Sequence, residues 1–442
     1  MLGISPSFLR YAIPEHSTIP MISRLPYSPP EGFIAQWPKL SQGAPMLFFG
    51  SSQSWSFLAL KGKHISWPSA KELRLSPEYP APTYGIPFTG GLVGVVPYDL
   101  MSGEQNSPSS PVCFKVSKVL AFHRESKSCF LCEADSYEKV DFDVDHKNFS
   151  DNQGSFWQES PTSGLILSPM ETDKSYLNKV QDVLNFIKAG RFYQLNLLRY
   201  FEVSNQPHHL DLVARYFQTP CPMGVWFKWE GQEVISFTPE RLARVNGQTR
   251  TLITQPIKGT AKTPENEKTL KEEKAKLNNS VKDRAELNMI VDLLRNDMYP
   301  LSEKGSIQVE SDGDVVQFGT VLHRVATIKS TLKQNLRLRD FFQALFPGGS
   351  ITGAPKIEVM KAIHELENRP RSYFMGTAFY LDPLQGNLDS NILIRTLIKS
   401  GSDISYGAGS GLVIRSNPEQ ELEEITTKCK VLTNPLPRKV KT

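Results

Sequence analysis

The chain has 442 residues, of which 39% are hydrophobic and 22% are charged, and its formal net charge is +4. This length can bury a large core and predicts two or three domains. The charges form no long block of one sign, which argues against a nucleic-acid-binding protein, and no run of about 18 apolar residues predicts a membrane span.

The first half of the chain reads mainly as strands. Apolar and alternating runs predict strands at 46–49 and 55–60, and two more within 112–132, while 90–96 is either a buried strand or a glycine-softened bend. A polar stretch at 148–163 is rich in Ser, Asn and Gln, which is typical of a linker. It predicts the boundary between an N-terminal subdomain, residues 1–150, and a second domain, residues 165–435.

The five cysteines are scattered along the chain. Cys129 and Cys132 have the CxxC spacing, but no second Cys or His pair completes a zinc site. On a strand, an offset of three places the two sulfurs on opposite faces, so we interpret them as two half-buried free thiols. Residues 1–20 lack the basic start and apolar run of a secretory signal, and we expect a cytoplasmic protein.

The second half mixes helices with strands. Apolar spacing predicts helices at 172–189, 266–277, 281–295, 338–345, 355–366 and 420–432. Strands are predicted at 192–203, 224–237, 374–381 and 392–398. Because the two types do not follow a regular βαβ rhythm, we predict an α+β fold.

Two predicted helices carry carboxylates that could act together. Glu286 stands at the edge of the apolar stripe of helix 281–295. In the last helix the spacing places Glu421, Glu424 and Lys428 on one face. Each set by itself is more often a solvated charged face, because charges at helical spacing are common. Carboxylates from separate helices can hold Mg²⁺, which prefers oxygen ligands, so the sequence permits a metal site without requiring one.

Two glycine-rich segments are further candidates. Residues 346–356 combine three glycines with a following helix start, where free N–H groups and the helix dipole attract a carboxylate or phosphate. A plain strand-to-helix connection explains this segment equally well. A second glycine-rich turn is predicted at 407–411, just before the acidic helix. Together with the strand cation Arg395 and the helical carboxylates, these segments favour a site for a dianionic ligand with a metal.

Six segments of the chain resemble the chorismate-utilising enzymes, which include aminodeoxychorismate, anthranilate, isochorismate and salicylate synthases. The matching segments, in the family's order, are 191–197, 238–242, 256–260, the helix of Glu286, the loop of Gly348 and the helix of Glu421. The likeness is dense from about residue 192 to 428. It implies the family fold, in which mixed and antiparallel sheets pack as a sandwich with surrounding helices, and it makes 165–435 the chorismate-binding catalytic domain.

The resemblance also implies residue roles. Glu286, Glu421 and Glu424 look like the magnesium-site carboxylates. Arg395 and Lys428 look like partners of the substrate's carboxylates, Gly409 and Thr260 like further backbone contacts, and His323 like an active-site histidine. Glu240 resembles the general acid that protonates the C4 hydroxyl of chorismate as it leaves.

Two positions distinguish the members of the family. Water-using relatives carry a lysine where Gln194 stands, and glutamine cannot act as a general base, which disfavours isochorismate or salicylate chemistry. Anthranilate synthases typically have alanine where Lys258 stands. The segment Pro-Ile-Lys-Gly-Thr, which contains Lys258, resembles instead the aminodeoxychorismate branch of the family. There the lysine is thought to form a transient covalent bond with the substrate. Anthranilate synthase component I and a non-catalytic chorismate-binding subunit remain as alternatives.

Ammonia for such a reaction must have a source. No cysteine of the chain sits on a tight turn between glycines, as a glutaminase nucleophile would. We therefore expect a separate glutamine amidotransferase subunit, a component II, as partner. Phe374, Arg415 and Ala326 depart from the family pattern, and the segment that holds tryptophan in many relatives is only faintly present at 47–52.

Overall fold

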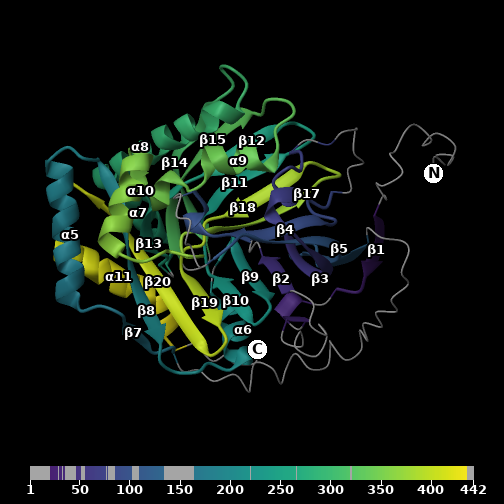
Figure 1. Ribbon diagram of the computed structural model, residues 1–442, viewed down its shortest axis with the longest axis horizontal. Coiled ribbons are helices and arrows are strands. Elements are labelled where there is room, and N and C mark those ends of the chain that lie inside the picture. Colours follow the sequence, from purple (N-terminus) through teal and green to yellow (C-terminus); the bar gives the residue numbers. More distant parts are fainter. Residues whose placement is uncertain are drawn as a thin grey trace.

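The computed structural model describes residues 20–27, 29–31, 33–34, 46–50, 55–75, 77, 85–101, 109–133, 164–219, 221–264, 266–318 and 321–435. The predicted domain boundary at 148–163 lies outside these residues, as does the end of the segment 47–52. Strands pair in one continuous antiparallel arrangement, and helices lie outside it (Figure 1). The predicted α+β fold is therefore confirmed.

The sheet has two limbs that meet at one long strand. The first limb, in order of pairing, contains β8 (Gln194–Val203), β20 (Asp403–Val413), β19 (Thr396–Ser400), β10 (Gln232–Ser236), β9 (Gly224–Trp229), β2 (Met46–Gly50), β3 (Trp55–Ile65) and β5 (Val112–His123). The second limb contains β5, β4 (Gly91–Val96), β17 (Thr377–Asp382), β18 (Asn387–Asn391), β11 (Arg241–Asn246), β12 (Thr251–Gln255) and β15 (Val321–Thr331).

Shorter or edge strands complete these limbs. β15 also pairs with β13 (Ile257–Lys262) and β14 (Gln308–Phe318), while β1 (Met21–Leu25) and β6 (Ser128–Glu133) extend from β5. β7 (Leu167–Pro169) and β16 (Gly353–Ala354) border β8. Strands from both predicted domains share the sheet, since β2 pairs with β9 and β4 with β17. The domain boundary itself stays a prediction.

The helices cover the ends of both limbs. Within the described residues, the α-helices with defined bounds are α2 (Trp67–Ala70), α5 (Asp173–Lys188), α6 (His209–Gln218), α7 (Glu267–Asn279), α8 (Val281–Met298), α9 (Leu338–Leu345), α10 (Lys356–Glu367) and α11 (Pro418–Thr433). α11 packs on β20 and α5, and α10 packs on β8. α7 and α8 cover β13, β14 and β15 at the end of the second limb (Figure 1). The two groups of helices thus flank β8, β20, β13 and β15.

α5 shows why these segments become helices where they do. Its buried side chains, from Tyr176 to Ile187, repeat at helical spacing. The Thr172 hydroxyl accepts a hydrogen bond from the Ser175 N–H at 3.2 Å, which satisfies a free donor of the first turn. Gly190 follows the helix with a φ of +77°, the left-handed conformation that glycine adopts without strain. Both predicted ends of this helix are confirmed.

Several strand predictions needed correction. The predicted strand 224–237 is a hairpin of β9 and β10, whose turn contains Glu230 and Gly231. β17 and β19 begin three or four residues later than predicted, at Thr377 and Thr396. The hairpins formed by β11 to β15 were not predicted, because apolar and polar residues do not alternate regularly along them and their pairing depends on cross-strand packing.

The predicted glycine-rich turn at 407–411 is wrong. These residues lie in the middle of β20, paired along their whole length with β8. A Cβ atom placed at Gly409 would lie only 2.5 Å from Asn196 Oδ1, which is closer than any side chain tolerates. Gly409 therefore serves the close approach of a side chain from β8 rather than a reversal of the chain.

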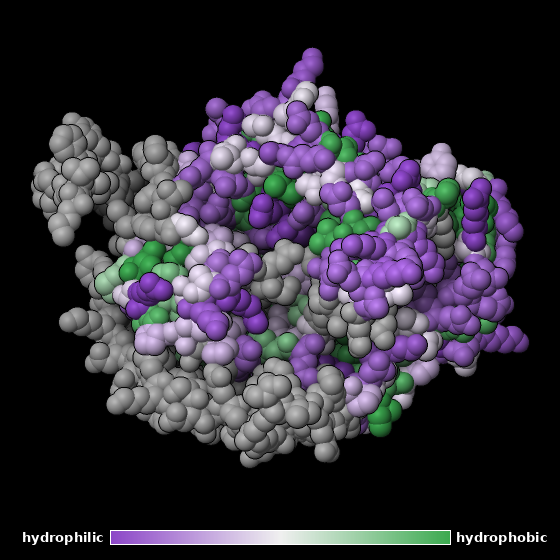
Figure 2. All heavy atoms as spheres, turned by 180° about the vertical axis from the view of Figure 1, so that it is seen from behind, coloured by the Kyte–Doolittle hydropathy of each residue, from purple (hydrophilic) through white to green (hydrophobic). Residues whose placement is uncertain are grey.

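The cysteines of the CxxC segment are oriented as predicted, but they are fully buried rather than half-buried. Cys129 and Cys132 are both buried in β6 and belong to separate core clusters, which confirms that they point to opposite faces. None of the helices in the described ranges is both long and apolar enough to cross a membrane. Figure 2 shows a largely hydrophilic surface on one face of the molecule, where the apolar residues gather in small separate groups.

Candidate active site

A cavity of about 680 Å³ opens between the end of the first limb and the end of the second. Its walls come from β8, β20, β13, β15, α8, α11 and the turn around Ser350. The predicted site residues that line it are Glu240, Lys258, Glu286, His323, Arg395, Gly409, Glu421, Glu424 and Lys428. Thr260 lies on β13 directly opposite His323 of β15. Residues from 240 to 428 of the sequence thus converge on one cavity.

Glu240 is a buried carboxyl in the segment between β10 and β11. Its Oε1 accepts a hydrogen bond from the Ser350 hydroxyl at 2.7 Å. Burial raises the pKa of Glu240, while the Ser350 bond and the positive charges of Lys258, Arg395 and Lys428 oppose this rise. The net upward shift brings the pKa of Glu240 closer to neutral pH, which suits a general acid.

Lys258 stands on β13 at the wall of the cavity and is half-buried. Gly259, with a φ of +71°, interrupts the register between β13 and β15 directly after it. A Cβ atom placed at Gly411 of β20 would lie 3.4 Å from Lys258 Nζ and 3.6 Å from Gln194 Nε2. The amine therefore lies beside β20 and within the same small region as the Gln194 amide.

Gln194, the first residue of β8, was predicted to belong to the site but is not among the residues that line the cavity. Its side chain is 1% exposed, and neither its Nε2 nor its Oε1 meets a hydrogen-bonding partner among the described residues. An amide buried without partners costs free energy unless something else satisfies it. Its Nε2 lies next to Gly411, which does line the cavity, and close to the Lys258 amine.

His323 and Arg395 both line the cavity, one as a neutral ring and the other as a cation. Burial, followed by the charge of Arg395, lowers the pKa of His323 to about 4. The imidazole is therefore neutral at pH 7, where it can donate or accept a hydrogen bond. Burial also lowers the pKa of Arg395, but an arginine keeps its charge at any physiological pH. Arg395 is thus a permanent positive charge that a substrate carboxylate could meet.

The α11 wall carries both signs of charge. Glu421 is buried and accepts a hydrogen bond from the Ser410 hydroxyl of β20. Glu424 is exposed at the rim, and its Oε1 pairs with Lys428 Nζ at 2.6 Å. Lys428 Nζ also donates to the Gly409 carbonyl oxygen at 2.6 Å. All three side chains line the cavity, which confirms that they share one face of the helix.

The predicted magnesium ligands come from two helices. Glu286 of α8, Glu421 and Glu424 line the same cavity. Within the described part of the chain, no group of three His, Cys, Asp or Glu side chains is arranged to hold a metal ion. Mg²⁺ usually binds through one or two carboxylates and keeps waters and substrate oxygens as its other ligands. The donors therefore fit Mg²⁺ in chemical type, and their role as ligands stays a prediction.

Sequence reasoning missed three residues of the site. Ser350 holds Glu240, Met375 lines the cavity with a φ of +59°, and Asn196 is buried with an Oδ1 atom that meets no described partner. The two-residue offset from Gln194 to Asn196 on a strand could have revealed that they share a face. Met375 follows Phe374, whose ring packs on Tyr200 with centroids 5.7 Å apart.

Comparison with protein families places the chain among known proteins. Residues 40–434 match the model of a family described as chorismate binding enzyme. The chain is 31% identical over 376 residues to aminodeoxychorismate synthase component 1 of Salmonella typhimurium, covering 83% of this chain and 81% of the relative. It is also 31% identical over 383 residues to anthranilate synthase component 1 of Bacillus subtilis, covering 79% and 74%.

A plant relative is longer than this chain. The protein named "Probable aminodeoxychorismate synthase, chloroplastic" of Oryza sativa subsp. japonica is 30% identical over 397 residues, and the match spans 79% of this chain but only 44% of the relative. Among solved structures, anthranilate synthase component I of Streptococcus pneumoniae TIGR4 superposes with a TM-score of 0.70 at 23% identity, covering 97% of each chain. This superposition shows that the fold is shared.

The buried His323 predicts a specific dependence of stability on pH. Its pKa in the folded chain is about 4, below the ordinary value of 6.5, so the stability that its neutral form contributes is complete above pH 6.5. This contribution should be lost as the pH falls toward 4, by up to about 1.4 kcal/mol per pH unit. Urea unfolding between pH 4 and 7 should show a shallower loss for His323→Gln, and equal slopes for the two proteins would contradict the burial effect.

Proposed function

The chain belongs to the chorismate-binding enzyme family, and we propose that it aminates chorismate at C4, as component I of an aminodeoxychorismate synthase. The product, 4-amino-4-deoxychorismate, is the precursor of p-aminobenzoate for folate. One observation carries the proposal: the amine of Lys258 lines the same cavity as the buried carboxyl of Glu240. A nucleophile and an acid on one cavity suit a reaction in which a hydroxyl leaves as an amine attacks.

The proposed chemistry has two displacement steps. In the first, the neutral Lys258 amine bonds to C2 of the ring, the double bonds shift, and the C4–O bond breaks. Glu240 gives its proton to the departing oxygen, which leaves as water. In the second, ammonia bonds to C4, the double bonds shift back, and the C2–N bond to Lys258 breaks, so that the lysine leaves as a neutral amine. The new ammonium at C4 then loses a proton, which restores the acid form of Glu240. The enolpyruvyl group is retained throughout.

The remaining residues would bind and orient the substrate. Arg395 and Lys428 supply positive charge for its two carboxylates, and neutral His323 supplies a hydrogen bond. Thr260 and Gly409 would add backbone contacts. These groups would strengthen substrate binding and orient the substrate, but they form and break no covalent bond in the reaction.

Magnesium belongs to this proposal as well. Glu286, Glu421 and Glu424 would hold the ion, whose charge would neutralise a substrate carboxylate when bound. Glu424 must then leave its pair with Lys428, which would free Lys428 for the substrate. We propose these roles because the three carboxylates reach one cavity from two helices.

Anthranilate synthase component I is the second candidate. Similarity to the Bacillus subtilis enzyme of that name equals the similarity to the Salmonella typhimurium aminodeoxychorismate synthase, at 31% identity. The two reactions differ in product, because an anthranilate synthase aminates C2 and releases pyruvate. A non-catalytic binding subunit is less well supported, since binding alone would need neither Lys258 nor Glu240 in the cavity.

The purified chain should convert chorismate in the presence of Mg²⁺ and an ammonium salt. We expect mass analysis to detect 4-amino-4-deoxychorismate, with the enolpyruvyl group still attached. Anthranilate and pyruvate as products would instead establish the second candidate. Bound but unchanged chorismate would identify a non-catalytic subunit.

Replacing the proposed nucleophile tests the covalent step. Lys258→Ala should lower the formation of aminodeoxychorismate by roughly 100-fold or more, or shift the product toward anthranilate, because no amine is left to bond to C2. Lys329→Ala provides a control, since that lysine forms a half-exposed pair with Glu310 on the outer strand pair of β14 and β15. Unchanged activity of Lys258→Ala would remove the covalent role.

The source of ammonia is proposed to be a separate amidotransferase subunit. All five cysteines are buried, and burial raises the pKa of each thiol to about 11 or 12, so none is a reactive thiolate. The isolated chain should therefore work with ammonium salts and not with glutamine. Equal rates with glutamine and ammonium, measured on purified chain, would refute the need for a partner.

A further inference from the structure

One edge of β8 lacks a continuous strand partner. β20 pairs with the other edge over its whole length, from Gln194 to Glu202. On the edge that β20 does not occupy, β16 pairs only with residues 194–195 and β7 only with residues 201–203. Between them, within the described residues, no strand pairs with the part of β8 that carries Asn196. Buried main-chain groups in such a gap need partners, because an unsatisfied one is costly.

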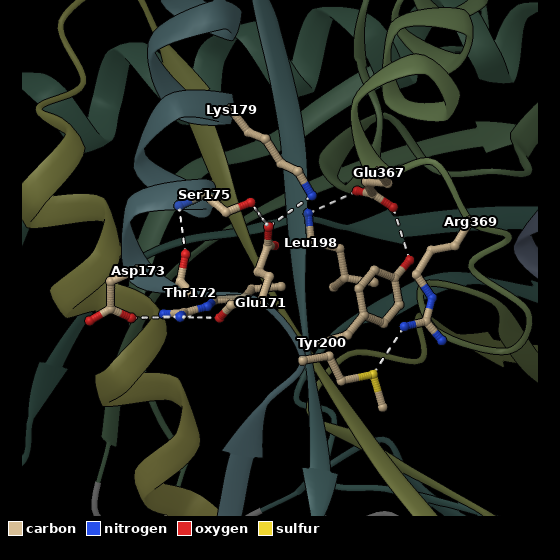
Figure 3. Close-up of polar contacts among 11 residues, drawn as sticks. Glu171, Thr172, Asp173, Ser175, Lys179, Leu198, Tyr200, Glu367 and Arg369 are labelled. Carbon is tan, nitrogen blue, oxygen red and sulfur yellow. Dashed lines mark hydrogen bonds and ion pairs between the residues drawn. The ribbon is translucent and has the colours of Figure 1, made fainter.

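A buried ion pair provides these partners. Glu367, at the end of α10, accepts hydrogen bonds from the Leu198 N–H and the Tyr200 hydroxyl, both at 2.9 Å (Figure 3). The Arg371 guanidinium donates to Glu367 at 2.6 and 3.0 Å. Its Nη2 also donates to the Asn196 carbonyl oxygen at 2.6 Å. The side chains of Glu367 and Arg371 are each 1% exposed, so the pair replaces the missing strand inside the core.

The second arm of Arg371 reaches the turn that holds the proposed acid. Its Nη1 donates to the Ile351 carbonyl oxygen at 3.0 Å. The Asn196 N–H donates to the Thr352 carbonyl oxygen at 2.8 Å, so β8 and this turn are joined twice, once directly and once through Arg371. Ser350, the residue before Ile351, donates to Glu240. One guanidinium therefore connects the strand of Gln194 and Asn196 with the hydroxyl that controls Glu240.

We propose that Arg371, oriented by Glu367, is a positioning residue for the acid step: it fixes the turn of Ser350 against β8 and so keeps the Ser350 hydroxyl on Glu240. The inference rests on the proposed function, in which Glu240 is the acid. A planar guanidinium with several fixed donors can hold two carbonyls and a carboxylate at once, which a lysine ammonium cannot do with the same geometry.

Stability alone gives a weaker account of the pair. A buried ion pair often contributes little net stability, because removing both charges from water offsets their attraction. What Arg371 does is fix the relative position of two segments that bear site residues, because its Nη1 donates to the Ile351 carbonyl and its Nη2 to the Asn196 carbonyl. We therefore expect the loss of Arg371 to affect catalysis more than stability.

The pH dependence of the acid step gives a readout that a purely structural role would not move. The groups that face Glu240 around the cavity are Ser350 from the turn, Lys258, His323, Arg395 and Lys428, together with the carboxylates Asp283, Glu286, Glu421, Glu423 and Glu424. Arg371 acts on only one of them, Ser350. Losing that hydrogen bond removes an effect that lowers the pKa of Glu240, so the loss of activity at high pH should move to higher pH.

The central experiment is Arg371→Lys, with kcat, KM for chorismate and the pH profile measured on the active fraction of purified enzyme. We expect kcat to fall roughly 10- to 100-fold, since misplacement of reacting groups by about 1 Å has effects of this size. KM should stay within about threefold, because Arg395 and Lys428 are untouched. A variant that is less stable but keeps the kcat and pH profile of the unmodified enzyme would overturn the proposal.

A double-mutant cycle with Ser350→Ala tests the route. Ser350→Ala alone should shift the alkaline limb upward, and Arg371→Lys should then add no further shift in that background. Additive shifts would show that Arg371 does not act through Ser350. If Arg371→Lys fails to fold, Asp99→Asn replaces it, because the Asp99 carboxylate accepts from the main-chain N–H groups of Arg371 and Ser372 at 3.2 and 2.7 Å. It should give a smaller shift in the same direction, and no shift would count against the proposal.

A matched control lies on β8, the strand that Arg371 contacts. Arg199 is also buried and donates to a carbonyl, that of Glu171, and to a carboxylate, that of Asp173, but these belong to the start of α5 (Figure 3 labels both acceptors). Arg199→Lys should lower stability without moving the pH profile, and a profile shift there would contradict the assignment to Arg371. The product of the unmodified enzyme decides the proposed function separately: if it is anthranilate, that proposal fails, while the comparison of variants still tests the positioning.

Discussion

The register between β8 and β20 is the constraint on which the site depends. It places Gly411 opposite Asn196 and Gly409 opposite Leu198, so that strand β20 has no side chain where the amides of β8 lean across it. A shift of one residue would turn Asn196 away from the cavity, because side chains alternate between the faces of a strand. The Lys258 amine and the Gln194 amide lie beside Gly411, and the Asn196 amide occupies the space that Gly409 leaves.

Electrostatics gives the cavity its second property. Carboxylates from α8 and α11 face cations from β13, α11 and the segment before β19, in surroundings where burial strengthens each interaction. Some of these charges already have partners, as in the Glu424–Lys428 pair and the Ser410–Glu421 hydrogen bond. A dianionic ligand would therefore exchange existing contacts for new ones, and the permanent charge of Arg395 would favour its entry.

Local patterns in the sequence predicted the helices better than the strands. The stripe of α5 and its capping residues are a local signal, and the predicted ends agree with the structure. The hairpins of β11 to β15 lack a regular alternation of apolar and polar residues, and their pairing depends on residues far along the chain. The error at 407–411 has the same cause, since glycines that serve a neighbouring strand look like turn glycines when read alone.

The sequence by itself determined the family, the α+β class and most of the candidate residues, because these follow from residue types in a characteristic order. It also determined that Glu421, Glu424 and Lys428 share a helix face, which helical periodicity requires. Only the tertiary structure decided that Ser350 holds Glu240 and that Arg371 connects their turn to β8. Those contacts join residues 110 and 175 positions apart, and no local rule of the chain specifies which distant groups will meet in the core.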